Sequence, residues 1–161
     1  MSYYHRISSL CYNFGVLHKN KGIINSFKEC PISLSHLKDI REESYKYKPD
    51  IYFIKNSDKR YITFQILFSQ GHKPKEIVGD ILNAILTFHI KKGYFIVSSE
   101  KDFNKVNNLL SISYSILQEI YQLKKNKDLP DLKVILIESN KTDGDVNLLL
   151  EDFCKEDKWL N

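Results

Sequence analysis

The sequence predicts an α/β domain with a mixed central sheet flanked by helices. Two runs of β-branched and aromatic residues, 51–55 and 60–68, are separated by the short polar stretch NSDK, which is typical of a β-hairpin. Two long segments with apolar residues at helical spacing follow, and a short apolar run separates them. A strand, a helix and a second strand in succession favour parallel pairing, so the sheet should be mixed.

The composition is that of one ordinary globular domain. The 161 residues are enough to bury a core, and 42% are hydrophobic and 27% charged. We interpret residues 1–161 as a single domain, with an N-terminal helical region at 1–45, an α/β core at 46–139 and a C-terminal helix at 140–161. No apolar run suits a membrane span and the N-terminus is too polar for a secretory signal, so we expect a cytoplasmic protein without a membrane partner.

Two sequence patterns predict helices in the N-terminal region. Ile7, Leu10, Phe14 and Leu17 fall on one face of a helix. The stretch SLSHLKDIREES, 33–44, predicts a second, shorter helix that opens at Ser33.

The elements after the hairpin follow from helical spacing and from helix start and stop signals. Residues 73–92 predict a helix that begins at Pro74 and is ended by Gly93. The remaining elements are a buried strand at 93–99, a long helix at 102–123, a strand at 131–139 and a short helix at 145–159 that packs on the domain.

The hairpin register follows from a turn centred between Ser57 and Asp58. Asp50 then lies opposite Gln65, Tyr52 opposite Thr63 and Phe53 opposite Ile62, although an odd loop length would shift the register by one residue. Opposed residues share a face of the sheet. One face is therefore an apolar core face (Ile51, Phe53, Ile62, Phe64, Ile66), and the other carries Asp50, Tyr52, Thr63 and Gln65.

Pro49-Asp50 at the start of a hairpin, a partner position on the next strand, and then a helix and a strand resemble the PD-(D/E)xK nuclease superfamily. This superfamily includes restriction endonucleases and archaeal Holliday-junction resolvases. The resemblance covers roughly residues 40–100 by the order of elements, and Pro49 and Asp50 are its matching motif residues. It implies a restriction-endonuclease-like fold in which Mg²⁺ or Mn²⁺, bound by the motif acids, activates water to attack a phosphodiester.

The sequence departs from this family at the second motif. Gln65-Ile66-Leu67 stands where the family has Glu-x-Lys. Gln65 can offer a carbonyl oxygen to a metal but no charge, and Leu67 cannot replace the lysine. The missing acid is then Glu76 or Asp80 on the following helix, and many members of the family also place an extra carboxylate upstream, here Glu42 or Glu43.

The resemblance therefore implies a rearranged site. Its metal ligands are Asp50, Gln65 and Glu76, and its cation is Lys73 or Lys75, with Lys73 placed on the scissile phosphate. The predicted catalytic residues are Asp50, Gln65, Glu76 and Lys73.

The net charge of +4 permits a nucleic-acid partner. The stretch SQGHKPKE, 69–76, puts basic residues at a helix N-terminus, which favours phosphate, although solvated lysines at a capped helix start would give the same pattern. Tyr45, Tyr47 and Tyr52 alternate with lysines and either stack on bases or pack on the core. The predicted nucleic-acid contacts are Lys46, Lys48, His72, Lys73 and Lys75, and the resemblance favours DNA over RNA and implies a homodimer, as in the junction resolvases.

Three functional interpretations remain open. The chain is a metal-dependent phosphodiesterase with a rearranged site, or a non-catalytic nucleic-acid-binding or assembly module of the same fold, or an unrelated α/β protein in which Pro49-Asp50 only opens a strand. A second Pro-Asp, Pro130-Asp131, shows how readily the dipeptide arises. Asp131 and Glu138 lie seven residues apart on one predicted strand, about 23 Å, so they cannot share a metal ion.

Overall fold

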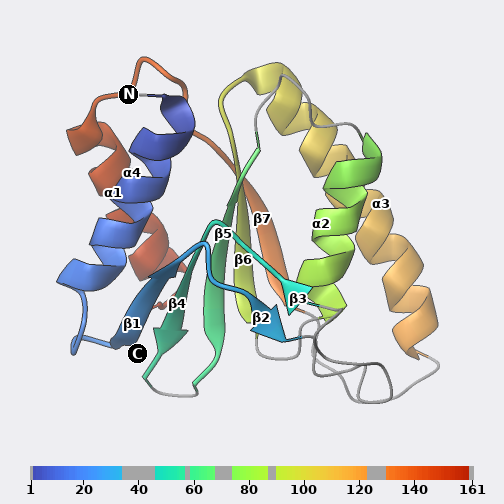
Figure 1. Ribbon diagram of the computed structural model, residues 1–161. Helices are drawn as coiled ribbons and strands as arrows, with labels where there is room; N and C mark the ends of the chain where they lie inside the picture. The colour runs from blue at the N-terminus through green and yellow to red at the C-terminus, as the bar shows by residue number, and fades with distance from the viewer. Residues whose placement is uncertain are drawn as a thin grey trace.

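A computed structural model of the chain describes residues 2–33, 46–56, 59–67, 74–86, 90–122 and 130–159. In these ranges a mixed sheet lies between two layers of helices (Figure 1). Helices α1 (Tyr3–Leu17) and α4 (Asp143–Glu156) cover one face, and α2 (Pro74–Leu86) and α3 (Glu100–Gln122) cover the other. The predicted α/β class, a mixed sheet flanked by helices, is confirmed.

Five of the described strands form one sheet in the order β1-β4-β5-β6-β7. The first three are antiparallel neighbours, and β5, β6 and β7 run parallel. Their bounds are Ile23–Lys28 for β1, Ile51–Lys55 for β4, Tyr61–Ile66 for β5, Ile90–Val97 for β6 and Asp131–Leu136 for β7. Two short strands, β2 (Ile32–Ser33) and β3 (Lys46–Tyr47), form a separate antiparallel pair.

The predicted hairpin register is confirmed. Tyr52 pairs with Thr63 and Phe53 with Ile62, so the core face of the hairpin lies under α1 and α4 as expected. The opposite face is buried as well, since Tyr52 is 7% and Thr63 2% exposed.

Two elements differ from expectation. The helix predicted at 73–92 ends at Leu86, and Gly93 lies inside β6, so the expectation that Gly93 ends this helix is wrong. Glycine is needed there for close packing, because a Cβ would lie 2.5 Å from Leu132 Cδ2 and 3.0 Å from Thr63 Oγ1. The region expected to be helical also contains β1 and β2, and the helix predicted at 33–44 falls outside the described residues apart from Ser33, which belongs to β2.

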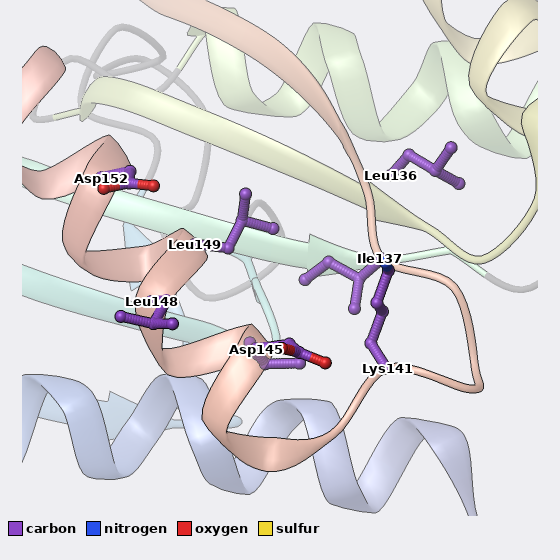
Figure 2. Close-up of a pocket in the computed structure, with 8 residues that line it drawn as sticks. Leu136, Ile137, Lys141, Asp145, Leu148, Leu149 and Asp152 are labelled. Carbon is purple, nitrogen blue, oxygen red and sulfur yellow. The ribbon is translucent and has the colours of Figure 1, made fainter.

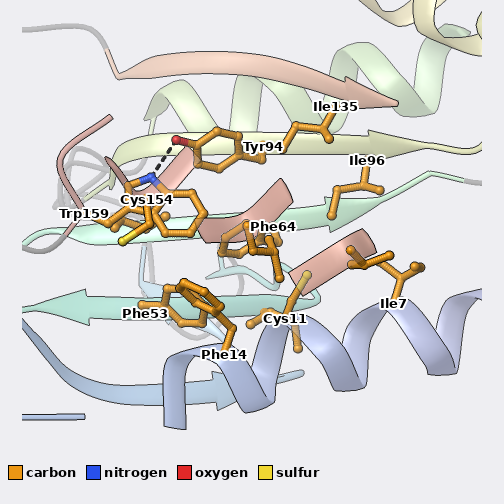
Figure 3. Close-up of a cluster of buried hydrophobic side chains, with 14 of the residues drawn as sticks. Ile7, Cys11, Phe14, Phe53, Phe64, Tyr94, Ile96, Ile135, Cys154 and Trp159 are labelled. Atoms are coloured by element: carbon orange, nitrogen blue, oxygen red, sulfur yellow. Dashed lines mark hydrogen bonds between the residues drawn. The ribbon is translucent and has the colours of Figure 1, made fainter. Parts of the chain in front are cut away.

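The core on the α1 and α4 face is closed by the C-terminal segment (Figure 3). Trp159 is fully buried, and its indole contacts the rings of Phe14, Phe53 and Phe64 edge-on. The predicted packing of this segment on the domain is confirmed.

A polar cluster holds the same segment to the beginnings of β6 and β7. The Tyr94 hydroxyl donates a hydrogen bond to Asp157 Oδ2, and Lys133 Nζ lies 2.6 Å from Asp157 Oδ1. Burial acts to raise the pKa of Asp157, but the hydrogen bonds from Lys133 and Tyr94 and the charge of Lys92 together hold it below its usual value. Asp157 is therefore a buried carboxylate that stays ionised.

Candidate functional site

Asp50 lies directly before β4 and is half-buried. Its Oδ1 accepts a hydrogen bond from the Tyr4 hydroxyl at 2.7 Å, and its Oδ2 accepts one from the backbone N–H of Ile66 at 2.6 Å. Its carbonyl oxygen accepts the N–H of Glu29 at 2.9 Å. One residue thus connects α1, the end of β5 and the residue that follows β1.

The place of Asp50 follows from the topology of the sheet. Because β4 is antiparallel to β5, the start of β4 adjoins the carboxyl end of β5. The parallel strand β6 ends at the same edge, where Leu67 N–H donates to the carbonyl of Ile96 at 2.8 Å. Open α/β sheets bind ligands outside the carboxyl ends of their parallel strands, so this edge is where a site is expected.

Glu29 and Asp50 share one hydrogen-bond donor. The Tyr4 hydroxyl that lies 2.7 Å from Asp50 also lies 3.0 Å from Glu29 Oε1. Glu29 adopts a left-handed backbone conformation, with φ of 53°, directly after β1. Burial raises the pKa of Tyr4, and the hydrogen bonds and charges of both carboxylates raise it further. The phenol therefore keeps its proton at neutral pH and donates it to this acidic pair.

Gln65, on β5, also accepts a hydrogen bond from a tyrosine hydroxyl. Its Oε1 accepts a hydrogen bond at 3.2 Å from the hydroxyl of Tyr47, which is 3% exposed. Burial raises the pKa of Tyr47, and the charges of Asp80 and Asp50 add to the effect. Of the two acids on α2 that the sequence left open, Asp80 is thus placed where its charge acts on a neighbour of Gln65.

The other predicted site residues are exposed or fall outside the described residues. Glu76 is in the first turn of α2 and is exposed. Lys75, on the same helix, and Lys48, which follows β3, are also exposed. His72, Lys73, Glu42, Glu43 and the side chain of Lys46 fall outside the described residues. Leu67, at the position of the family's lysine, is 2% exposed and belongs to the core beneath α2 and α3.

The described tyrosines near the hairpin pack on the domain. Tyr52 is stacked between the rings of Phe27 and Tyr61, with ring centroids 4.8 and 5.2 Å away. Tyr47 and Tyr52 are both buried. Packing on the core, one of the two interpretations left open by the sequence, is therefore confirmed for these two rings, and Tyr45 lies outside the described residues.

The second Pro-Asp is structural. Asp131 begins β7 and forms an ion pair with Lys92 at 3.4 Å. The carbonyl of Pro130 accepts a hydrogen bond from the Tyr114 hydroxyl, which also accepts the N–H of Leu132 at 2.9 Å. Tyr114 therefore caps the beginning of β7.

A cavity of about 300 Å³ lies elsewhere, between the end of β7 and α4 (Figure 2). Its acidic side includes Asp145, whose carboxylate accepts the N–H of Thr142 at 3.2 Å in the capping box of α4. No predicted site residue lines this cavity, so it is distinct from the edge at Asp50. The lining residues are Leu136, Ile137, Lys141, Asp145, Val146, Leu148, Leu149 and Asp152.

Asp50 and Glu29 are the residues at this edge that could hold a divalent metal ion. Within the described ranges, no three His, Cys, Asp or Glu side chains come together in an arrangement that would hold a metal ion. Mg²⁺ needs only one or two carboxylates, because it retains several waters. Asp50 and Glu29 converge on one hydroxyl and are such a pair, whereas the amide oxygen of Gln65 is bonded to Tyr47.

Sequence reasoning missed Tyr4 and Glu29. Tyr4 is 46 residues from Asp50, and no motif connects the two. The stretch IINSFK, which forms β1, does not alternate between apolar and polar residues, so no local pattern pointed to Glu29, which follows that strand.

Comparisons of this chain with protein families, with curated proteins and with solved structures find no match. Among the helices in the part of the chain that the structure describes, none combines the length and apolar character needed to cross a membrane.

Proposed function

We propose that this protein is a nucleic-acid-handling domain of the PD-(D/E)xK nuclease type, and that it cleaves phosphodiesters with a divalent metal ion held at Asp50. The observation that carries the proposal is the convergence of Asp50 and Glu29 on the hydroxyl of Tyr4, at the carboxyl ends of parallel strands. The order of hairpin, α2 and parallel β6 supports it, because the resemblance implies that order.

Each residue at this edge has a defined role in the proposal. Asp50 and Glu29 are the charged ligands, and Gln65 offers its amide oxygen in place of the family's glutamate. Tyr4 is a positioning residue, because its hydroxyl fixes the separation of the two carboxylates. A bound Mg²⁺ or Mn²⁺ would supply an activated water and neutralise charge on the phosphate.

The helix α2 and the turn before it complete the proposed site. Lys73 contacts the scissile phosphate, and the further acid comes from α2, where Glu76 was assigned from the sequence. Asp80 is the competing acid, since its charge acts on Tyr47 beside Gln65.

The proposed substrate is a nucleic acid, with DNA favoured over RNA. Lys48 and Lys75 are exposed and available to phosphates, and Lys46, His72 and Lys73 complete the proposed contacts. Phosphate contacts of this kind release counterions, so binding should weaken steeply as salt is raised.

The test is a titration of Mg²⁺ and Mn²⁺ with labelled single-stranded, duplex and branched DNA and RNA. We expect metal-dependent cleavage that falls at least ~100-fold in Asp50→Ala and is retained in Asp152→Ala, an exposed acid on α4. Mn²⁺ binding followed by electron paramagnetic resonance gives an independent readout and should weaken in Asp50→Ala and Glu29→Gln. Wild-type protein that neither cleaves nor binds Mn²⁺ would rule the proposal out.

A non-catalytic module of the same fold is the second candidate. It is favoured by the burial of Leu67 and by the hydrogen bonds that both Asp50 oxygens accept from the protein, which give the carboxylate a structural role. In that case wild type and Asp50→Asn should bind nucleic acid equally without cleavage. Lys48→Ala and Lys75→Ala should both weaken the binding and reduce its salt dependence.

A further inference from the structure

The outer surface of α3 is unusual for this protein. From Val106 to Gln118 the helix carries no charged residue, in a chain of which 27% is charged. Ile112 and Ile116, one helical turn apart, are 57% and 55% exposed. Their exposed neighbours on the helix are small or neutral (Asn108, Ser111, Ser115). Charge depletion around exposed apolar side chains is the compositional mark of an interface centre.

This uncharged surface is bounded by one charge of each sign. Lys105 lies seven residues before Ile112, and Glu119 lies seven residues after it. Seven residues are nearly two full helical turns, so the three side chains leave α3 on the same side. Lys105 is half-buried and Glu119 exposed. Lys105, Ile112 and Glu119 therefore form a stripe along α3, with a cation at one end, an anion at the other and Ile112 at the midpoint.

We propose that α3 is the interface of a symmetric homodimer, in which the α3 helices of two copies pack antiparallel across a two-fold axis at Ile112. This arrangement places Lys105 of each copy opposite Glu119 of the other, so two ion pairs flank the apolar centre. Ile112 meets its own counterpart on the axis, and Ile116 packs against the small Asn108 of the second copy.

The charges identify a second copy as the occupant of this surface. A nucleic acid would need cations where α3 has none between Val106 and Gln118. Two copies that each carry a net charge of +4 repel over most of their surfaces, and an uncharged face is where they can approach. A two-fold interface must also be self-complementary, which the order of Lys105, Ile112 and Glu119 provides.

The position of α3 in the fold suits this contact. Helix α3 packs against α2, β6 and β7 (Figure 1). Its Ile112 and Ile116 side chains are left exposed. Helices α1 and α4 lie on the opposite face of the sheet. The proposed dimer therefore does not rest on the role proposed for Asp50, and either can fail without the other.

The first test is the oligomeric state of the full chain, measured by sedimentation velocity from low to high micromolar concentration. We expect a concentration-dependent dimer whose affinity falls at least ~10-fold in Ile112→Asp. The matched control is Asn107→Asp, which adds the same charge to the far side of the same helix and should leave the dimer intact. Circular dichroism confirms that each variant is folded. A wild type that stays monomeric throughout would overturn the proposal.

A charge exchange tests the antiparallel arrangement itself. Lys105→Glu and Glu119→Lys should each weaken the dimer, because each places like charges opposite one another. The double variant Lys105→Glu/Glu119→Lys should recover the wild-type affinity. A double variant weaker than either single change would contradict antiparallel pairing.

A cross-link locates the two-fold axis. Ile112→Cys places two thiols next to each other on the axis, so mild oxidation should give a covalent dimer. Asn107→Cys should not cross-link above the background of wild type, in which Cys11 and Cys154 are buried and Cys30 is partly exposed. Equal cross-linking of the two variants would place the axis elsewhere.

Discussion

The indole N–H of Trp159 donates a hydrogen bond to the hydroxyl of Tyr94 at 2.7 Å, across 65 residues of sequence. The same hydroxyl donates to Asp157, so it acts as acceptor and donor at once. Both partners are buried, so losing either hydrogen bond is costly. One oxygen atom on β6 thus holds the C-terminal segment in place.

We expect Tyr94→Phe to lower the free energy of unfolding by about 1–3 kcal/mol, because it leaves the buried indole N–H of Trp159 without its acceptor and removes one hydrogen bond from the Asp157 carboxylate, which keeps Lys133. Urea unfolding followed by fluorescence measures this, since Trp159 is the only tryptophan. Tyr12→Phe, at a half-buried tyrosine on α1, is the control. Equal losses in the two variants would mean that the Tyr94 hydroxyl has no special role.

The stabilising effect of Asp157 should depend on pH. Its pKa in the folded protein is below its usual value, so its contribution is present above the unfolded pKa near ~4 and is lost as pH falls through the folded pKa. We expect Asp157→Asn to be less stable than wild type at pH 7 by about 1–3 kcal/mol, and the difference to shrink below pH ~4. Thermal unfolding across this range, with Asp152→Asn as control, measures it. A difference that does not change with pH would exclude an ionised Asp157.

Two glycines in helices should respond to alanine in opposite ways. At Gly15 in α1 a Cβ would collide with the ring of Phe53 and lie 2.7 Å from Ser26 Oγ, whereas at Gly79 in α2 it meets nothing within 4 Å. Gly15→Ala should therefore destabilise the protein by about 1–3 kcal/mol despite the better helix propensity of alanine. Gly79→Ala should stabilise it by about 0.5–1 kcal/mol. Urea midpoints compare the two, and stabilisation by Gly15→Ala would contradict the close approach of α1 to the sheet.

The substitution Gln65→Glu tests the proposed metal site from the other direction. A carboxylate in place of a neutral amide should raise Mn²⁺ affinity by about tenfold, because affinity for hard cations rises with ligand charge. Isothermal titration calorimetry measures this. Gln118→Glu on α3 adds the same charge away from the site and should leave the affinity unchanged. No gain in Gln65→Glu would show that residue 65 does not face the metal.

The sequence predicts the hairpin and the long helices because their signals are local. A short polar turn fixes which residues of β4 and β5 face each other, and apolar spacing identifies the buried sides of α2 and α3. The position of Gly93 was mistaken because a glycine after an apolar helix pattern also fits a helix end. Its actual role is steric and depends on Leu132, a neighbour on another strand.

The candidate site was predictable in part. Asp50 and Gln65 follow from the hairpin register, which is local. Tyr4 and Glu29 reach Asp50 from α1 and from the end of β1, through contacts that only the folded chain creates. Leu67 illustrates the same limit, because its burial beneath α2 depends on the parallel crossover.

The burial of Trp159 has a consequence for the order of biosynthesis. The core between α1 and the sheet contains Ile7 near the beginning of the sequence and Trp159 near its end. A ribosome therefore releases α1, β4 and β5 long before the residue that closes their shared core leaves the exit tunnel. During that interval the rings of Phe14, Phe53 and Phe64 lack one side of their packing. The shared core can therefore close only after Trp159 has left the exit tunnel.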